Sequence, residues 1–580
     1  MLKNLLAILL MLTEISCTTP GIYPSSTSRP RRDYVAYGSQ AAISTAHPLA
    51  SQAGLAILKE GGNAADAAIA ASFVISVVRP HSTGLGGGGF LLYHNPDSKA
   101  LEAWDFRERA PSASQKDMFL TQEKKSKDYS YKGQSLKHAS QNGPLSVGTP
   151  GLISGLLKFY HEHASMPLAR LMSDAIAIAE NGFPVYPSLE AALKKRQDAI
   201  FFFPASQKIF APNRSLLTTG DLLIQKDLGK TLRAIQSQGA DVFYRGWIAK
   251  KITQDIQKYG GILSPRDFIT YTTRTSSPLI GTYKGYTIAS MPLPSSGGIH
   301  LIQMLNMLED DTFNTKEPMH YENLHIIAET MKRAYADRAH YLGDPLFVKV
   351  PTNSLISKAY AKKLRQSIQK DATPADQIHN GSFPIEPTTT THISVVDAWG
   401  KGVSTTQTIN GYFGSGMVAE GTGIVLNNEM DDFTVHPNIP NLFGLMGNEK
   451  NEIAPKKTML SSMTPTMVFD QKGSLHLLAG SPGGSRIINA TFWTIFNALS
   501  HKMTLADAVH KSRIHHQWKP DTIYHELDLL PKETIQKLQE KGHTLKSTRA
   551  IGDVQAIMKR PDGSWTAVSD TRSDGQPLAF

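Results

Sequence analysis

The pattern of apolar residues changes near Thr390, and this change limits which folds the chain can form. Before it, residues 150–260 carry long apolar stretches with helical spacing, such as GLISGLLKFYHEH. After it, short alternating segments such as HISVVD and GVSTTQTI lie between turn residues and predict strands joined in hairpins. Helices and hairpin strands bury their apolar faces by stacking in layers. We therefore expect an α+β fold built from layers of helix and sheet.

Residues 41–80 are predicted to be helical and buried, because they are rich in Ala and apolar almost all round. Gly61 and Gly62 would end a first helix, and Asn63 would cap a second one. The sequence therefore predicts two buried helices near the start of the folded chain.

A glycine-rich segment follows, TGLGGGGFLLYH, in which Gly84, Gly86 and Gly89 match the spacing G-x-G-x-x-G. A dinucleotide-binding motif needs a strand before it and a helix after it. Here a helical stretch precedes the glycines and a strand follows them, so nucleotide binding is disfavoured. We expect these glycines to let the backbone turn tightly or pass close to another segment.

Length and composition are typical of a soluble globular protein with a large core. The chain has 580 residues, of which 41% are hydrophobic and 19% charged. Its net charge of +10 comes from Lys and Arg spread along the whole sequence, so no nucleic-acid partner is expected. Cys17 is the only cysteine, which excludes an intramolecular disulfide. No motif for a metal or a cofactor is visible, and we expect neither.

The first residues resemble an export signal. A positive charge and a short apolar run, LKNLLAILLML, fit the core of a signal peptide and are too short to span a bilayer. Residues 1–17 are predicted to be a signal peptide, and residues 18–40, rich in Ser, Thr and Pro, a flexible tether. Cys17 leaves a lipoprotein-type signal open, and Glu14 argues against it. The expected location is periplasmic or secreted, with a lipid on Cys17 as the only candidate membrane contact.

Thr390 lies in a run of four threonines before the first predicted downstream strand. A threonine hydroxyl is a poor nucleophile until a base takes its proton, and a free α-amine with a pKa of about 8 can do so. Such an amine exists only if the chain is cut between Thr389 and Thr390. The hydroxyl of Thr390 could make this cut by attacking the preceding carbonyl, which gives an ester that water opens. We therefore expect a large subunit, residues 41–389, and a small catalytic subunit, residues 390–580.

A series of motifs around and before this threonine resembles the γ-glutamyltransferase (γ-glutamyl transpeptidase) family, bacterial type. The downstream motifs are TTHISVVD, QTING, NNEMDDF, SSMTPT and SPGGSR, and the upstream ones include GGNAADAA, HSTGLGGGGF, DFRERAP, GTPG, MPLPSSGG and AYADR. The resemblance implies an N-terminal-nucleophile hydrolase with an αββα four-layer sandwich, formed as a heterodimer of two subunits from one precursor. It also implies attack on glutathione and other γ-glutamyl compounds, with the acyl group passed to water or to an amino acid or peptide.

The resemblance assigns roles to the residues that match the family's motifs. Thr390 is the expected nucleophile, and Thr408 orients it. The backbone N–H groups of Gly483 and Gly484 are expected to bind the oxyanion, which suits glycines at the start of a helix. The substrate's α-amine is expected to be bound by Asn410, Glu429 and Asp432, and its α-carboxylate by Arg107, Ser461 and Ser462.

Two positions depart from the family's pattern. The segment HPNIPNLFGLMGN resembles the lid loop of bacterial members, several of which carry a tyrosine where this chain has Phe443. Because phenylalanine has no hydroxyl, we expect the lid to lack a hydrogen bond to the site and to be looser. Near the C-terminus, DTR replaces the usual DPR, and Arg572 is retained.

Two alternatives remain open at this point. The first is a β-lactam or glutaryl acylase of the same superfamily, which would share Thr390 and the self-cleavage. Asp432 discriminates, because a substrate without an α-amine has no use for that carboxylate. The second is an unprocessed surface protein that uses the fold for binding.

Overall fold

The computed structural model describes residues 33–378, 390–527 and 530–580. The predicted signal peptide, most of the tether, Cys17 and Thr389 lie outside the described residues. The segment from Tyr34 to Phe580 forms one compact unit. Among the described residues, no helix is both long enough and apolar enough to cross a bilayer.

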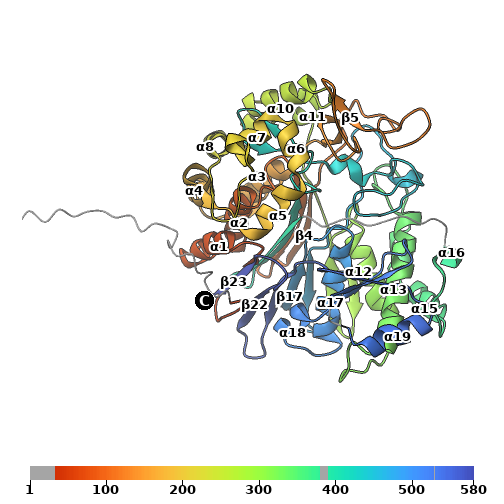
Figure 1. The fold of residues 1–580 in the computed structure, drawn as a ribbon. Helices are drawn as coiled ribbons and strands as arrows, with labels where there is room; N and C mark the ends of the chain where they lie inside the picture. Colours follow the sequence, from red (N-terminus) through yellow and green to blue (C-terminus); the bar gives the residue numbers. More distant parts are fainter. Residues whose placement is uncertain (1–32, 379–389, 528–529) are drawn as a thin grey trace, which may run out of the picture. The chain divides into compact units, whose positions relative to one another are not determined.

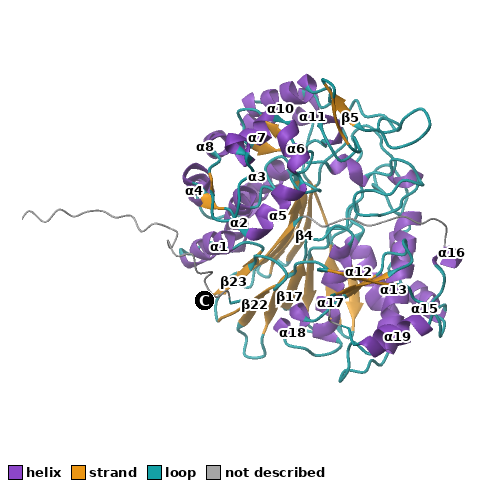
Figure 2. Cartoon of the chain, viewed as in Figure 1, coloured by secondary structure: helices purple, strands orange, loops and turns teal. Residues whose placement is uncertain are grey.

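Two antiparallel sheets of seven strands each form the centre of this unit (Figure 2). The first sheet contains, in spatial order, β1 (Val35–Gly38), β22 (Trp565–Ser569), β21 (Gln555–Lys559), β17 (Leu475–Gly480), β16 (Thr466–Phe469), β11 (Tyr286–Ser290) and β10 (Leu279–Tyr283). The second contains β23 (Gln576–Ala579), β2 (Ala42–Thr45), β12 (Thr391–Val396), β13 (Gly402–Thr408), β3 (Gly88–Asn95), β4 (Ala100–Phe106) and β9 (Arg274–Ser276). The sheets pack face to face through an apolar layer that includes Phe90, Leu92, Met467, Leu478 and Ile557.

Helices cover the outer face of each sheet (Figure 1). On the second sheet these are α1 (Pro48–Lys59), α2 (Ala64–Val78) and α3 (Leu152–His163). On the first they are α12 (Gly297–Met307), α17 (Arg486–Leu499) and α18 (Leu505–His510). Helices therefore lie on the outer faces of two packed sheets, which agrees with the predicted α+β fold built from layers of helix and sheet.

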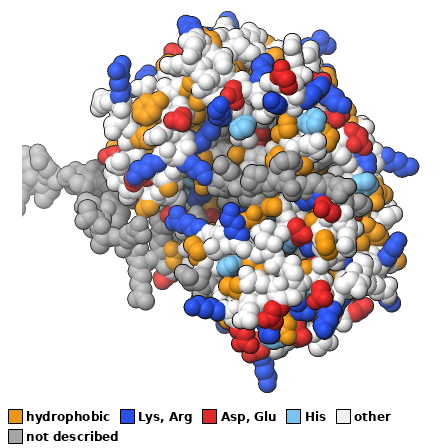
Figure 3. All heavy atoms as spheres, turned by 45° about the vertical axis from the view of Figure 1, so that its right-hand side comes forward, with side chains coloured by type: hydrophobic (Ala, Val, Ile, Leu, Met, Phe, Trp, Pro, Cys, Tyr) orange, Lys and Arg blue, Asp and Glu red, His pale blue; other side chains and the backbone are white. Residues whose placement is uncertain are grey.

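The remaining elements surround these layers. The helices are α4 (Leu168–Asn181), α5 (Pro187–Lys195), α6 (Gln197–Phe202), α7 (Pro204–Phe210), α8 (Lys226–Gln238), α9 (Ala240–Tyr244), α10 (Trp247–Lys258), α11 (Pro265–Ile269), α13 (Tyr321–Tyr341), α14 (Thr352–Leu355), α15 (Lys358–Gln366), α16 (Ala375–Ile378) and α19 (Lys532–Glu540). The short strands are β5 (Tyr129–Tyr131), β6 (Gln134–Leu136), β7 (Phe183–Pro184), β8 (Leu222–Leu223), β14 (Val418–Ala419), β15 (Ile424–Val425), β18 (Ile514–His515), β19 (Ile523–Glu526) and β20 (Leu545–Thr548). On the face shown in Figure 3, Lys and Arg side chains are interspersed with Asp and Glu.

The prediction of helix from residue 41 onward is wrong for the first few residues. Ala42–Thr45 form β2, which pairs with β12 and β23 inside the second sheet. All four residues, Ala-Ile-Ser-Thr, are buried, so both faces of the strand lie inside the fold and no alternation of apolar and polar residues reveals it. The helical prediction is confirmed beyond this strand: Asn63 caps α2, and its side chain and that of Asp66 form a reciprocal capping box.

The glycine-rich segment allows close backbone approach, as predicted. A Cβ atom added to Gly88 would lie 2.5 Å from the carbonyl oxygen of Phe106, and one added to Gly87 would overlap the carbonyl oxygen of Thr408. These glycines therefore let the chain enter β3 between its two neighbours, β13 and β4.

Candidate active site

Thr390 immediately precedes β12, in the middle of the second sheet, and is buried with 4% of its surface exposed. Its Oγ1 lies 3.2 Å from Oγ1 of Thr408, at the end of the neighbouring strand β13. The backbone N–H of Asn410 donates to the same Thr408 oxygen at 2.8 Å. A hydroxyl has one donor and can accept twice, so Thr408 can accept from Asn410 and still donate to Thr390.

The backbone of Thr390 is strained. Its φ is 128°, a conformation that residues with a Cβ atom rarely adopt and that is especially unfavourable for a β-branched residue. The surrounding sheet must therefore impose this conformation on the residue.

One closed pocket brings together most of the residues predicted from the motifs. It has a free volume of ≈ 20 Å³, which is room for about one water molecule. It is lined by Arg107, Thr390, Thr408, Asn410, Glu429, Asp432, Phe443, Leu445, Ser461, Ser462, Met463, Gly484 and Ile487. Of the predicted catalytic and binding residues, Gly483 alone is not part of this lining.

Arg107 is paired with two of the predicted ammonium ligands. Its guanidinium donates to Glu429 through Nη1 and to Asp432 Oδ2 through Nη2, the latter at 2.6 Å. A third carboxyl group, that of Glu108, has Oε2 4.0 Å from Nη1. Because an unpaired buried charge is costly, these groups neutralise one another while the pocket is closed.

The electrostatics of this cluster favour a cationic ligand. Burial raises the pKa of Glu429 and of Asp432, and Arg107 opposes the rise. Burial also raises the pKa of Glu108 to about 8. Burial disfavours the charged form of Arg107, but the carboxylates of Glu429 and Asp432 outweigh it and raise the pKa of Arg107. Three carboxyl groups around one guanidinium leave acceptor capacity for an additional positive charge.

A second arginine, Arg338 on α13, braces the loop of the two predicted serines. Its Nε donates to Ser296 Oγ at 3.1 Å and its Nη2 to Ser462 Oγ at 3.4 Å. The N–H and hydroxyl of Ser296 in turn donate to the carbonyl oxygen of Ser461 at 2.8 and 2.7 Å. Burial lowers the pKa of Arg338 to about 10, and Asp432 opposes the shift. The resemblance gave Arg338 no role, although Arg338 ends AYADR, one of the motifs that carry the resemblance, and that motif is the signal in the sequence that could have found it.

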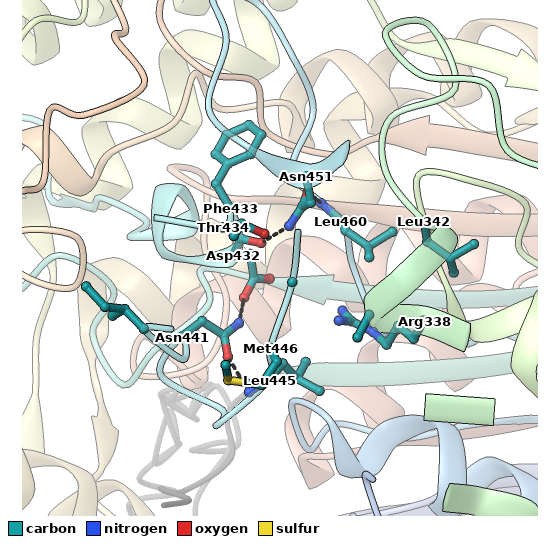
Figure 4. A pocket seen from close by; sticks show the side chains of 13 residues that line it. Arg338, Leu342, Asp432, Phe433, Thr434, Asn441, Leu445, Met446, Asn451 and Leu460 are labelled. Carbon is teal, nitrogen blue, oxygen red and sulfur yellow. Dashed lines mark hydrogen bonds between the residues drawn. The ribbon is translucent and has the colours of Figure 1, made fainter. Parts of the chain in front are cut away.

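Asp432 lines a second cavity as well, of ≈ 10 Å³, and Arg338 is part of the lining of this second cavity (Figure 4). Asn441, from the predicted lid loop of residues 436–448, donates to Asp432 Oδ1 at 2.9 Å across this cavity. The N–H of Leu442 donates to Asp431 Oδ2 at 2.6 Å. The expectation that the lid lacks hydrogen bonds to the site is therefore wrong, because Asn441 and the backbone supply them without a hydroxyl at position 443.

Phe443 closes the pocket against the turn that precedes α17. It is 5% exposed, and a Cβ atom added to Gly484 would overlap its ring. Gly483 and Gly484 have φ values of 143° and 56°, which favour glycine, and their carbonyl oxygens accept from Arg486 and Ile487 at the start of α17. Within the described residues, no group of three or more His, Cys, Asp or Glu side chains is arranged to hold a metal ion.

Comparisons with known proteins show which family and which folds this chain resembles. The gamma-glutamyltranspeptidase family matches residues 50–580. The chain is 40% identical to the glutathione hydrolase proenzyme of Escherichia coli (strain K12), over 92% of this chain and 90% of that protein. It is 34% identical to the acylase ACY 1 proenzyme of Pseudomonas sp. (strain SE83), over 94% of both. Its structure resembles the crystal structure of a cephalosporin acylase from Bacillus halodurans, with a TM-score of 0.82 and 26% identity, over 97% of this chain and 99% of that one.

Proposed function

The chain belongs to the gamma-glutamyltranspeptidase family of enzymes, and from this premise we propose that it is a self-cleaving glutathione hydrolase and γ-glutamyltransferase. One observation carries the proposal. The Thr390 hydroxyl, 3.2 Å from that of Thr408, shares a closed pocket with a guanidinium and carboxylates that suit both charges of a γ-glutamyl group.

The first proposed step is maturation. Thr390 Oγ1 attacks the carbonyl carbon of Thr389, the C–N bond breaks, and an ester and a free Thr390 amine form. Water then opens the ester, which leaves a carboxylate on Thr389 and restores the hydroxyl. The strained φ of Thr390 supports this step, because cutting the peptide bond removes the constraint. The products are the two subunits of an N-terminal-nucleophile hydrolase with αββα layers, divided between Thr389 and Thr390.

In the proposed catalytic cycle, the free α-amine of Thr390 takes the proton of its own hydroxyl. Oγ1 attacks the γ-carbonyl carbon of the substrate, and the N–H groups of Gly483 and Gly484 stabilise the oxyanion. The tetrahedral intermediate collapses, the amine transfers the proton to the leaving nitrogen, and a γ-glutamyl ester remains. Water or the amino group of an amino acid or peptide then attacks this ester and regenerates Thr390.

The proposed recognition uses the paired charges of the pocket. The substrate's ammonium group binds Glu429 and Asp432, with the amide of Asn410 nearby, and its carboxylate binds Arg107 with Ser461 and Ser462. A zwitterion suits this pocket because its carboxylate can pair with Arg107 while its ammonium group pairs with Glu429 and Asp432. These new pairs replace the ones that Arg107 makes with the two carboxylates in the closed state.

We also propose export to the periplasm or the medium through residues 1–17, with lipidation of Cys17 left open. Mass spectrometry of the mature N-terminus distinguishes a cut after the signal peptide from a lipid on Cys17.

The test of the enzyme proposal is a denaturing gel with an activity assay. The purified chain should give two fragments, and Edman sequencing of the smaller one should begin at Thr390. Thr390→Ala should remain a single band and lose turnover of γ-glutamyl-p-nitroanilide. A single intact band from active wild-type protein would rule the mechanism out and favour an unprocessed binding protein.

The likeness of the chain to acylases, in sequence and in fold, supports an acylase as the second candidate function. Glutaryl-p-nitroanilide separates the two functions, because it lacks only the α-amine. A hydrolase that uses Asp432 and Glu429 should prefer the γ-glutamyl compound. Equal or better turnover of the glutaryl compound would support an acylase.

A further inference from the structure

The lid must open for any substrate to bind, because the closed pocket has room for about one water molecule. Phe443 and Leu445 of the lid loop line this pocket. What holds the lid closed therefore controls entry of the substrate and of water. The side chain of Phe443 has no polar group for this purpose, so the holding contacts must come from elsewhere.

Gln517, between β18 and β19, makes such contacts with both ends of its side-chain amide. Its Nε2 donates to the carbonyl oxygens of Phe443 at 3.2 Å and Gly444 at 3.1 Å, and to that of Lys519 at 3.3 Å. Its Oε1 accepts from Ser485 Oγ at 2.7 Å and from His515 Nε2 at 2.9 Å. Carbonyl oxygens can only accept, so the amide has one possible orientation. The side chain is 2% exposed, which shields these bonds from water.

His515, which contacts Gln517 Oε1, also has only one tautomer that fits its neighbours. Asn489 Nδ2 donates to the carbonyl oxygen of His516 at 3.2 Å, which fixes the orientation of the Asn489 amide. The same Nδ2 lies 2.8 Å from His515 Nδ1, which must therefore accept. His515 then carries its proton on Nε2 and donates it to Gln517. Burial, with a smaller contribution from Arg486, lowers the pKa of His515 to about 3, so the ring is neutral near pH 7.

We propose that Gln517 is a positioning residue of the lid, in addition to the contacts of Asn441 and Leu442: it holds the backbone of Phe443 and Gly444 closed over Thr390 and ties it to Ser485, next to the Gly483–Gly484 turn. This inference rests on the proposed function. It explains how the lid stays closed with phenylalanine at position 443, because the hydrogen bonds end on backbone carbonyls that any side chain there would leave in place.

The test compares three variants of the full-length, self-cleaved protein. Gln517→Met removes every hydrogen bond of the amide with little change in volume. Gln517→Asn keeps the amide but is one methylene too short to reach the lid. Gln225→Met is the matched control, because Gln225 is equally buried and donates to a single backbone carbonyl, that of Val77, at 2.9 Å, outside the pocket.

We expect both Gln517 variants to self-cleave and to lower KM for γ-glutamyl-p-nitroanilide by up to about tenfold, with kcat changed less than threefold, because the closed lid excludes substrate and the variants lose about two modest hydrogen bonds that favour it. Hydrogen exchange at residues 441–446 should accelerate by a similar factor, while the control changes neither quantity. If Gln517→Met does not fold, Gln517→Asn carries the test.

Two failures can be told apart. Unchanged KM and unchanged lid exchange in a folded Gln517 variant would overturn the role of Gln517 and leave the enzyme proposal standing. Wild-type protein that neither cleaves itself nor turns over the γ-glutamyl compound would overturn the proposed function itself.

Discussion

Two buried arginines, one lining the Thr390 pocket and one lining the neighbouring cavity, have different partners, and this difference suggests different tasks. Arg107 is bound by carboxylates, which a zwitterionic ligand would replace. Arg338 instead donates to the hydroxyls of Ser296 and Ser462, and Ser462 lines the pocket. A serine oxygen that accepts from a guanidinium is free to donate its own proton to an anion. We therefore expect Arg338 to act on the substrate carboxylate through Ser462.

Replacing Arg338 by Met should raise KM for substrates that carry the α-carboxylate. A hydrogen bond that involves a charged group contributes about 1.5–3 kcal/mol, or roughly tenfold to a hundredfold. The increase should appear with γ-glutamyl- and glutaryl-p-nitroanilide. It should be absent with 4-aminobutyryl-p-nitroanilide, which has the amine but no carboxylate.

Arg333→Met is the control for this substitution, because Arg333 is buried on the same helix and pairs with Glu329 outside the pocket. Arg338→Lys, which retains the charge, should recover part of the effect. An equal loss on all three substrates would mean that Arg338 is merely structural.

The strand β12, which follows the nucleophile, contacts the opposite sheet through the side chain of His392. Residues two apart lie on one face of a strand, so His392 shares the face of Thr390. Its Nδ1 lies 2.8 Å from Thr406 Oγ1, parallel to the contact between Thr390 and Thr408. The ring of His392 packs directly on Gly480, at the end of β17 and just before the Gly483–Gly484 turn. This close packing sets the spacing between the nucleophile and the proposed oxyanion-binding turn.

Gly480→Ala should therefore disturb both stability and chemistry. The added Cβ would overlap the His392 ring, and overpacking of this kind costs about 1–3 kcal/mol. We expect a lower urea midpoint and a slower appearance of the two fragments. In the control, Gly84→Ala, the nearest atom to the new Cβ is Ser76 O at 4.0 Å. Wild-type cleavage kinetics in Gly480→Ala would contradict this account.

At the scale of the whole molecule, the second sheet contains strands from both proposed subunits, that is, from before and after the proposed cut in the sequence. β12 and β13, which follow Thr390, lie between β2 and β3, which precede it, so the two subunits would share one sheet. The ladders between β2 and β12 and between β3 and β13 do not include the cut bond. Cleavage should therefore leave the two subunits associated.

A buried ion-pair cluster near the C-terminus should govern acid stability. Asp570 is fully buried, with Oδ2 2.9 Å from Arg513 and Oδ1 2.8 Å from Arg572, the arginine retained in DTR. Burial alone would raise the pKa of Asp570, but the two arginines outweigh it and hold that pKa below its usual value. A lowered folded pKa means that the stabilisation is present above the unfolded pKa of about 3.9 and is lost as the pH falls through the folded value.

Asp570→Asn should cost about 3–5 kcal/mol at pH 7, because it leaves the buried Arg513 without its carboxylate, while Arg572 keeps its pair with Glu526. In this variant the free energy of unfolding should also fall less steeply with pH below about pH 4 than in the wild type, as measured by urea unfolding between pH 7 and pH 3. The control is Asp241→Asn, in an exposed pair with Arg245, which should cost under about 1 kcal/mol. An unchanged acid slope in Asp570→Asn would refute the assignment.

Local signals were sufficient for the layers and for part of the pocket. The capping residue Asn63, the hairpins after Thr390 and the glycines at the start of β3 follow from hydrophobic period and backbone preference, which act over a few residues. The strand Ala42–Thr45 could not be predicted, because a four-residue segment buried on both faces, with the sequence AIST, shows no apolar–polar alternation.

The sequence by itself determined which residues to place around Thr390, because the motifs keep chemical type and order along the chain. Only the tertiary structure decided their partners: Arg107 with the carboxylates, Arg338 with Ser462, and Gln517 with the lid. The physical reason is that a side chain's polarity shows that it needs a hydrogen-bond partner when buried, whereas the partner's identity depends on which distant segments packing brings within about 3 Å.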